Sequence, residues 1–178
     1  MNRITSTIPV SFYQRDTVSV AKDILGKVMR VKNQNIWRSG IIVEDEAYLR
    51  NDPASHSFKG LNKRNQSMFK DAGTVYVFKI HRVHCVNVVT REGEAVLIRA
   101  LDPLENISIP TNGPGKLCNA LNITKDEHDG QSITGNKIQI IDYVYPDLSI
   151  QISERVGISK SKEWPLRFYV KENPFVSR

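Results

Sequence analysis

Cysteine and long apolar runs are what this sequence has least of. Cys85 and Cys118 are the only cysteines among 178 residues, each with apolar neighbours. A disulfide framework of the secreted type is therefore disfavoured, and both thiols are predicted to be reduced core residues. No apolar run is long enough to cross a bilayer, and the first fifteen residues lack the basic start and apolar core of a signal peptide. We expect a cytoplasmic protein with no transmembrane segment, associated with the nucleoid if its source is bacterial.

What is present indicates a folded, basic domain. Hydrophobic residues make up 40% and charged residues 25%, as in globular proteins, and the length suits one domain over residues 1–178. Lysine and arginine number 25 against 19 acidic residues, which gives a net charge of +6. Such a charge attracts polyanions, so nucleic acid is the first partner to consider, and we expect a monomer.

The apolar pattern predicts an α+β fold dominated by an antiparallel sheet. A helix is predicted over residues 16–25, with Asp16 or Thr17 as its cap and Gly26 at its end. A second helix is predicted over 116–121. The predicted strands cover 28–31, 36–48, 74–80, 85–90, 95–101, 137–143, 148–152 and 166–170, with hairpin turns at 32–35, 81–84 and 91–94.

Residues 41–56 begin as a β-branched strand and end as a polar loop. Side chains alternate along a strand, so Ile42, Glu44, Glu46 and Tyr48 are predicted to share one face. A proline-containing turn then brings His56 back toward the strand end. Acid, aromatic ring and imidazole would then meet in one pocket. The alternative is that both glutamates are solvated edge charges and that Tyr48 is ordinary packing.

Several basic residues bear on partners. Residues 57–73 are predicted to form a basic surface loop that faces phosphate groups of a partner. The alternative is that this loop is only solvated. Arg99 interrupts an apolar strand, and since a buried arginine needs a partner, Glu46 is the candidate. The sequence His81-x-x-His84-Cys85 resembles a metal motif only superficially, because a tight turn would splay these side chains.

Nine segments form a specific set when they are read in order. They are EDEAY (44–48), DPASH (52–56), MF (68–69), GTVYV (73–77), NV (87–88), EAVLIRALDPLE (94–105), NGPGKLC (112–118), RVGI (155–158) and PLRFYV (165–170). Each is weak alone, but the ordered set covers nearly the whole chain. It resembles the alkyladenine DNA glycosylases, also called 3-methyladenine DNA glycosylases.

The resemblance implies a monofunctional base-excision enzyme on a compact domain around a curved antiparallel sheet, with a β-hairpin that inserts into DNA. Its substrate would be double-stranded DNA containing alkylated or deaminated purines, which are flipped out before the N-glycosidic bond is hydrolysed. The resemblance implies that Glu46 activates the water, that Arg99 helps to hold it, and that the backbone carbonyl of Val156 contacts it. It implies no lyase step, metal, nucleotide or other cofactor, and no membrane partner.

The same resemblance assigns the remaining site residues. The walls of the base pocket are matched by Tyr48, His56 and Phe78, and Asn87 matches a residue that crowds the amino group of guanine. The inserting hairpin is matched by His81, Arg82, Val83 and His84, and contacts to the DNA backbone by Lys63, Arg64 and Lys116.

Three positions depart from the family pattern. Phe78 stands where the family often has tyrosine, and Asn62-Lys63 where it usually has Thr-Pro. His81-Arg82 replaces a common Tyr-Gly, and since imidazole is a smaller wedge than phenol, we expect the flipped state to be held more weakly than in a tyrosine homologue.

Two other functions compete with this hypothesis. One is a non-catalytic nucleic-acid binder with the same fold, which would bind DNA without releasing a base. The other is a metal nuclease that uses Glu44, Asp45, Glu46 and Asp52. The alternation of the first three across the strand argues against a shared metal ion.

Overall fold

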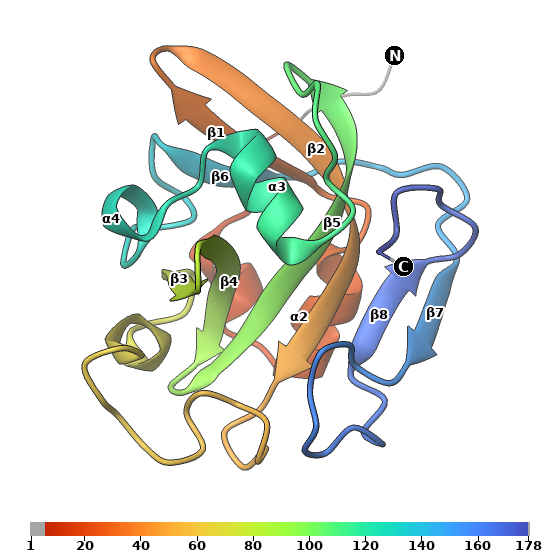
Figure 1. Ribbon diagram of the computed structural model, residues 1–178. Coiled ribbons are helices and arrows are strands. Elements are labelled where there is room, and N and C mark those ends of the chain that lie inside the picture. Colours follow the sequence, from red (N-terminus) through yellow and green to blue (C-terminus); the bar gives the residue numbers. More distant parts are fainter. Residues whose placement is uncertain (1–5, 178) are drawn as a thin grey trace.

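The computed structural model describes residues 6–177. Both ends of the predicted 1–178 domain therefore lie outside the described residues. So do residues 1–5 of the N-terminal segment in which no signal peptide is expected. One antiparallel sheet of eight strands organises this region, in the order β3-β4-β5-β2-β1-β6, with β8 on β2 and β7 on β8. The sheet curls, and helices pack against it (Figure 1). The predicted α+β fold around a curved antiparallel sheet is confirmed.

The helices are α1 (Val10–Tyr13), α2 (Thr17–Ile24), the 3-10 helix η1 (Gln66–Phe69), α3 (Pro114–Leu121) and α4 (Lys125–His128). The strands are β1 (Val28–Asn33), β2 (Ile36–Tyr48), β3 (Val75–Ile80), β4 (Val83–Arg91), β5 (Glu94–Glu105), β6 (Ile138–Ile141), β7 (Ile150–Ser153) and β8 (Arg167–Val170). Within residues 6–177, no helix is both long and apolar enough to span a membrane.

Helix α2 forms where the sequence predicts it. The carboxylate of Asp16 accepts a hydrogen bond from the backbone N–H of Ser19 at 2.9 Å, which caps the helix. Its buried residues include Val20 and Ile24, and Gly26 follows its end at φ +79°, in the left-handed region that glycine adopts without strain. Asp16 is therefore the cap, one of the two residues that the sequence offered for that role.

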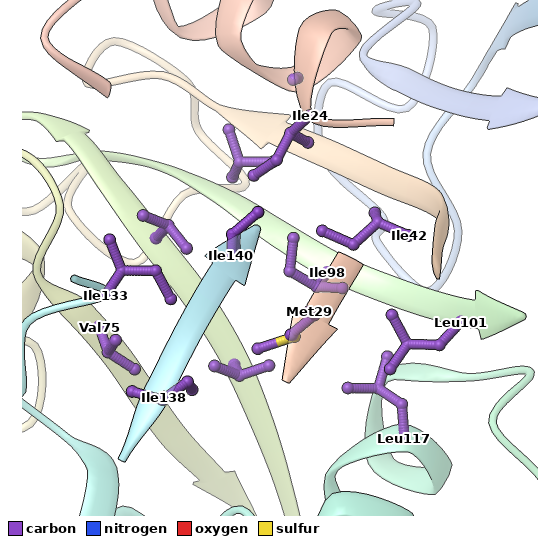
Figure 2. Packing of buried hydrophobic residues seen from close by; sticks show 14 of the residues in the cluster. Ile24, Met29, Ile42, Val75, Ile98, Leu101, Leu117, Ile133, Ile138 and Ile140 are labelled. Carbon is purple, nitrogen blue, oxygen red and sulfur yellow. The ribbon is translucent and has the colours of Figure 1, made fainter. Parts of the chain in front are cut away.

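The main core lies under the sheet, between α2, α3 and the strands. Ile24 of α2, Met29 of β1, Ile98 of β5, Leu117 of α3 and Ile140 of β6 converge there (Figure 2). Each is essentially inaccessible to solvent. The long strands β2 and β5 are thus fixed along one face, so the polar residues of their other face are held in place. Cys85 and Cys118 are both buried and unpaired, as predicted.

The long strand β2 contains an irregularity that the sequence did not predict. Its pairing with β5 shifts register between Ile42 and Glu44 and again between Glu44 and Asp45. Ile42 packs in the main core, whereas Glu44 bonds to Arg99, which also pairs with Glu46. The prediction that Ile42 shares their face was wrong, because a β-bulge interrupts strict alternation.

The β3–β4 hairpin is tighter than predicted. Ile80 pairs with Val83, so the loop is only His81-Arg82, and His84 belongs to β4 and does not form part of the turn. His81 has φ +53°, a left-handed conformation in which histidine is enriched among residues other than glycine. Helix α3 also starts earlier than the predicted 116, at Pro114, because proline is well suited to a first helical turn. The short helices α1 and α4 were missed.

Candidate active site

Glu46 lies near the end of β2 with no solvent-accessible surface, and both of its carboxylate oxygens are held. Its Oε1 accepts the backbone N–H of Val156 at 2.7 Å and lies 3.5 Å from Arg99 Nε. Its Oε2 accepts the hydroxyl of Tyr48 at 2.8 Å. Burial raises the pKa of Glu46, and Arg99, Val156 and Tyr48 partly oppose that rise. The result is a fixed carboxylate that is more basic than an exposed one.

Glu44 is the closer partner of Arg99, which the sequence did not predict. Arg99 Nε donates to Glu44 Oε1 at 3.0 Å, and Arg167 Nε donates to the same oxygen at 2.7 Å. Near the end of the chain, Ser177 donates its backbone N–H at 2.6 Å and its hydroxyl at 2.7 Å to Glu44. Burial alone would raise the pKa of Glu44, but the hydrogen bonds from Arg167 and Ser177, with the charge of Arg99, outweigh it and lower the pKa. Glu44 is thus an anion that orients Arg99 toward Glu46.

Asp45 has a different environment from its two neighbours. It lies two residues before Ala47, a member of the main core, and therefore points to the core face of the strand. It is fully buried, and both of its carboxyl oxygens are without a hydrogen-bond partner among the described residues. Burial, and then the charges of Glu46 and Glu44, raise the pKa of Asp45 well above its ordinary value. Asp45 therefore lies outside the site, in surroundings that favour its neutral form.

An aromatic cavity of about 260 Å³ opens beside Glu46, and the partners of Glu46 (Tyr48, Arg99 and Val156) line it. The rings of His56 and Phe78 meet edge to face, with centroids 4.5 Å apart. The structure thus brings together the Glu46 carboxylate, the Tyr48 ring and the His56 imidazole, as the sequence predicts. It excludes the alternative that Glu44 and Glu46 are solvated charges at a strand edge, because both are fully buried.

Tyr76 is a wall of this cavity that sequence reasoning missed. Its hydroxyl is 2.9 Å from His56 Nδ1, and its backbone carbonyl accepts Asn87 Nδ2 at 3.1 Å. Its position two residues before Phe78 on β3 was the available signal, because alternate residues share a face. Desolvation lowers the pKa of His56, although its ring is partly exposed at the mouth of the cavity. His56 is thus held as a neutral imidazole whose tautomer Tyr76 can fix.

The loop that carries Val156 is anchored by a buried ion pair. Arg155 donates to the carboxylate of Asp52 and, at 3.1 Å, to the backbone carbonyl of Ala47. Its guanidinium also lies 4.6 Å from the centroid of the Tyr48 ring. The sequence placed Asp52 in the proline-containing turn and in the metal-nuclease alternative, and predicted no ion pair for it. In the structure it fixes Arg155, and through it the Val156 N–H that bonds to Glu46.

The hairpin tip projects beside the cavity. His81 and Arg82 are exposed, and so are the apolar side chains of Ile80 and Val83, at 49% and 45% of their surface. An apolar wedge at a hairpin tip is suited to entry between base pairs. The sequence singled out His81, Arg82, Val83 and His84 in this hairpin, and the structure adds the exposed side chain of Ile80.

The three predicted backbone-contact residues do not form one cluster. Lys63 and Arg64 are exposed in the 57–73 loop, and Arg64 lines a cavity next to the aromatic one, together with Lys79 and Lys125. Lys116 lies at the start of α3 and lines a different groove. Within residues 6–177, no group of three or more side chains is arranged to hold a metal ion. Of the acids in the nuclease alternative, Asp52 is bound to Arg155 and Asp45 faces the core.

Comparison with known proteins identifies the family. Residues 11–174 match the family described as methylpurine-DNA glycosylase. The chain belongs to this family. Relatives named "Putative 3-methyladenine DNA glycosylase" include one from Methanoculleus marisnigri, 44% identical over 97% of this chain and 99% of the relative, and one from Legionella pneumophila, 44% identical over 96% and 98%. One from Agrobacterium fabrum is 38% identical over 96% of this chain and 92% of the relative. Membership implies a glycosylase that acts on DNA and confirms the predicted resemblance.

Proposed function

We propose that this protein is a monofunctional DNA glycosylase that flips alkylated or deaminated purines out of duplex DNA and hydrolyses their N-glycosidic bond, which starts base excision repair. The observation that carries the proposal is Glu46, a buried carboxylate held by Tyr48 and Val156 beside an aromatic cavity.

Glu46 is proposed to activate the attacking water. The water oxygen forms a bond to C1′ of the sugar while the bond from C1′ to the base nitrogen breaks, and the water proton passes to Glu46. The transition state resembles an oxocarbenium ion, as in glycoside hydrolysis, so the same carboxylate also stabilises its positive charge. Arg99, whose Nε lies 3.5 Å from Glu46, partly offsets the rise that burial causes in the pKa of Glu46, and is proposed to orient the water.

The aromatic cavity is proposed to hold the flipped base. Tyr48, His56 and Phe78 offer ring surfaces on which a purine can stack. A purine alkylated at N3 or N7 is cationic, and a ring face attracts such a cation by about 0.5 to 2 kcal/mol more than a neutral base. Asn87 lines the same cavity, held by the backbone of Tyr76, and is proposed to exclude the amino group of guanine.

The proposal includes no lyase step. Among the described residues, those that line the cavity include no lysine, so no primary amine is placed to attack C1′. A cationic base leaves as a neutral molecule and needs no protonation. A neutral base such as hypoxanthine must gain a proton, so the two kinds of substrate place different demands on this site.

The test is single-turnover release of free base from duplexes that carry 7-methylguanine or hypoxanthine. The parent is compared in EDTA with Glu46→Gln, and with Glu172→Gln as a matched surface control, since the Glu172 side chain is 84% exposed. We expect release by the parent and the control and loss of release in Glu46→Gln. Binding by all three without release from either duplex would favour the non-catalytic DNA binder. Strand cleavage without base release, present without EDTA and abolished by it, would favour the metal nuclease.

A further inference from the structure

A basic groove of about 940 Å³ adjoins the tip of the β3–β4 hairpin. The cations that line it are Lys32, Arg38, Arg82, Lys116 and Lys137. Glu127 is the one carboxylate among the described lining residues. The β1–β2 hairpin, α3 and α4, which supply many of the lining residues, lie on one side of the molecule, away from β7 and β8 (Figure 1).

Most of these cations are not neutralised by the protein itself. Among the ion pairs of residues 6–177, none involves Arg38, Arg82 or Lys137. Lys116 Nζ donates to the side-chain amide oxygen of Asn112 at 3.3 Å, which leaves its charge uncompensated. Clustered like charges repel one another, and a groove lined by them attracts a polyanion.

The position of the groove relative to the hairpin indicates which polyanion it would hold. Ile80 at the end of β3 lines the aromatic cavity, as do Cys85 and Asn87 farther along β4. At the tip itself, Arg82, Val83 and His84 line the basic groove. A hairpin that inserts into a duplex, as the resemblance implies, has one DNA strand on each side. The strand that gives up its base must lie on the side of the aromatic cavity.

We propose that the basic groove binds the phosphodiester backbone of the undamaged strand, opposite the flipped nucleotide. Lys32, Arg38 and Lys137 then contact phosphates on that strand. Arg64, Lys79 and Lys125, which line the cavity next to the aromatic one, contact phosphates of the damaged strand. The assignment of the two strands depends on the proposed function, because it assumes a base flipped into the aromatic cavity. Holding both backbones would make the protein selective for duplex over single-stranded DNA.

The test measures binding to a duplex with an uncleavable abasic-site analogue, over a range of salt concentrations. The triple variant Lys32→Gln, Arg38→Gln, Lys137→Gln is compared with the parent and with Lys171→Gln, an exposed lysine on the far side that is 3.9 Å from Glu172. Each lost phosphate contact lowers the slope of log affinity against log salt by about 0.9. We expect the triple variant to lose roughly two to three units of slope and at least about tenfold in affinity at ~0.1 M salt. Lys171→Gln should bind like the parent.

Neutral methylphosphonate linkages then assign the strand. Placed in the undamaged strand, they should weaken the parent and leave the triple variant unaffected; placed in the damaged strand, they should weaken both proteins. The proposal would be overturned if the triple variant kept the parent's affinity and salt slope. It would also be overturned if the triple variant became insensitive to methylphosphonates in the damaged strand but stayed sensitive to those in the undamaged strand. Base release from 7-methylguanine by the parent is scored separately. If the parent releases base but the triple variant binds DNA as tightly as the parent, the proposal for the groove is refuted and the proposed function stands. If binding depends on the groove but the parent releases no base, the proposed reaction is refuted and DNA binding by the groove stands.

Discussion

Asp45 is expected to destabilise the fold, and to do so more strongly as pH rises. Its carboxyl group is fully buried and neither oxygen has a hydrogen-bond partner among residues 6–177, so Asp45→Val should stabilise the protein by about 1 to 3 kcal/mol, the usual cost of an unsatisfied buried polar group. Because the folded-state pKa is raised, the folded protein binds more protons than the unfolded chain above about pH 4. Stability of the parent therefore falls with rising pH, by at most about 1.4 kcal/mol per pH unit from this residue, until the folded-state pKa is passed.

The assay is urea unfolding of parent and Asp45→Val at about pH 5 and about pH 8. We expect the gain in Asp45→Val to be larger at the higher pH. Asp52→Val is the contrasting variant: Asp52 is equally buried but bound to Arg155, so its loss should cost about 3 to 5 kcal/mol. A gain in Asp45→Val that does not depend on pH, or a loss of stability at the higher pH, would refute this reasoning.

Two further predictions concern the site. In Tyr48→Phe the hydroxyl that lowers the pKa of Glu46 is lost, so the acidic limb of the pH–rate profile for base release should move to higher pH. The rate below neutrality should fall about tenfold, which corresponds to the loss of a hydrogen bond of ~1.4 kcal/mol. An acidic limb at the same pH as in the parent would contradict this. In Gly115→Ala, the added methyl would lie 2.0 Å from Val83 Cγ1, so Val83 at the hairpin tip must move. Duplex binding should then weaken at least several-fold with little change in unfolding midpoint, and binding equal to the parent would show that it does not depend on this contact.

Much of the fold could be read from local pattern. Turn residues separate the β-branched runs that form β3, β4 and β5, and the pairing of these strands in a meander follows from their short connections. The pocket prediction was also local, since Glu46 and Tyr48 are two apart on one strand and His56 follows a short turn. These features depend on residues close in the sequence, where alternation and turn chemistry apply.

The parts that escaped prediction depend on distant segments. The bulge in β2 is set by its partner β5, and it decides that Glu44 joins Glu46 while Ile42 does not. Glu44 is bound by Arg99, Arg167 and Ser177, which lie 55 to 133 residues away in the chain. Charge pairing at such separations leaves no periodicity in the sequence, so the contacts that support the Glu46 carboxylate became visible only in the structure.

The central claim, that Glu46 activates water, is tested most directly by the pH dependence of single-turnover 7-methylguanine release. This base leaves without protonation, so the acidic limb reports the water-activating carboxylate alone. Because the pKa of Glu46 is raised, we predict that the parent's rate falls as pH drops through a value above that of an ordinary glutamate. Glu46→Gln should be slower by about 10² to 10⁴ and lack that limb. Release by Glu46→Gln at the parent's rate, or with the same acidic limb, would contradict the account.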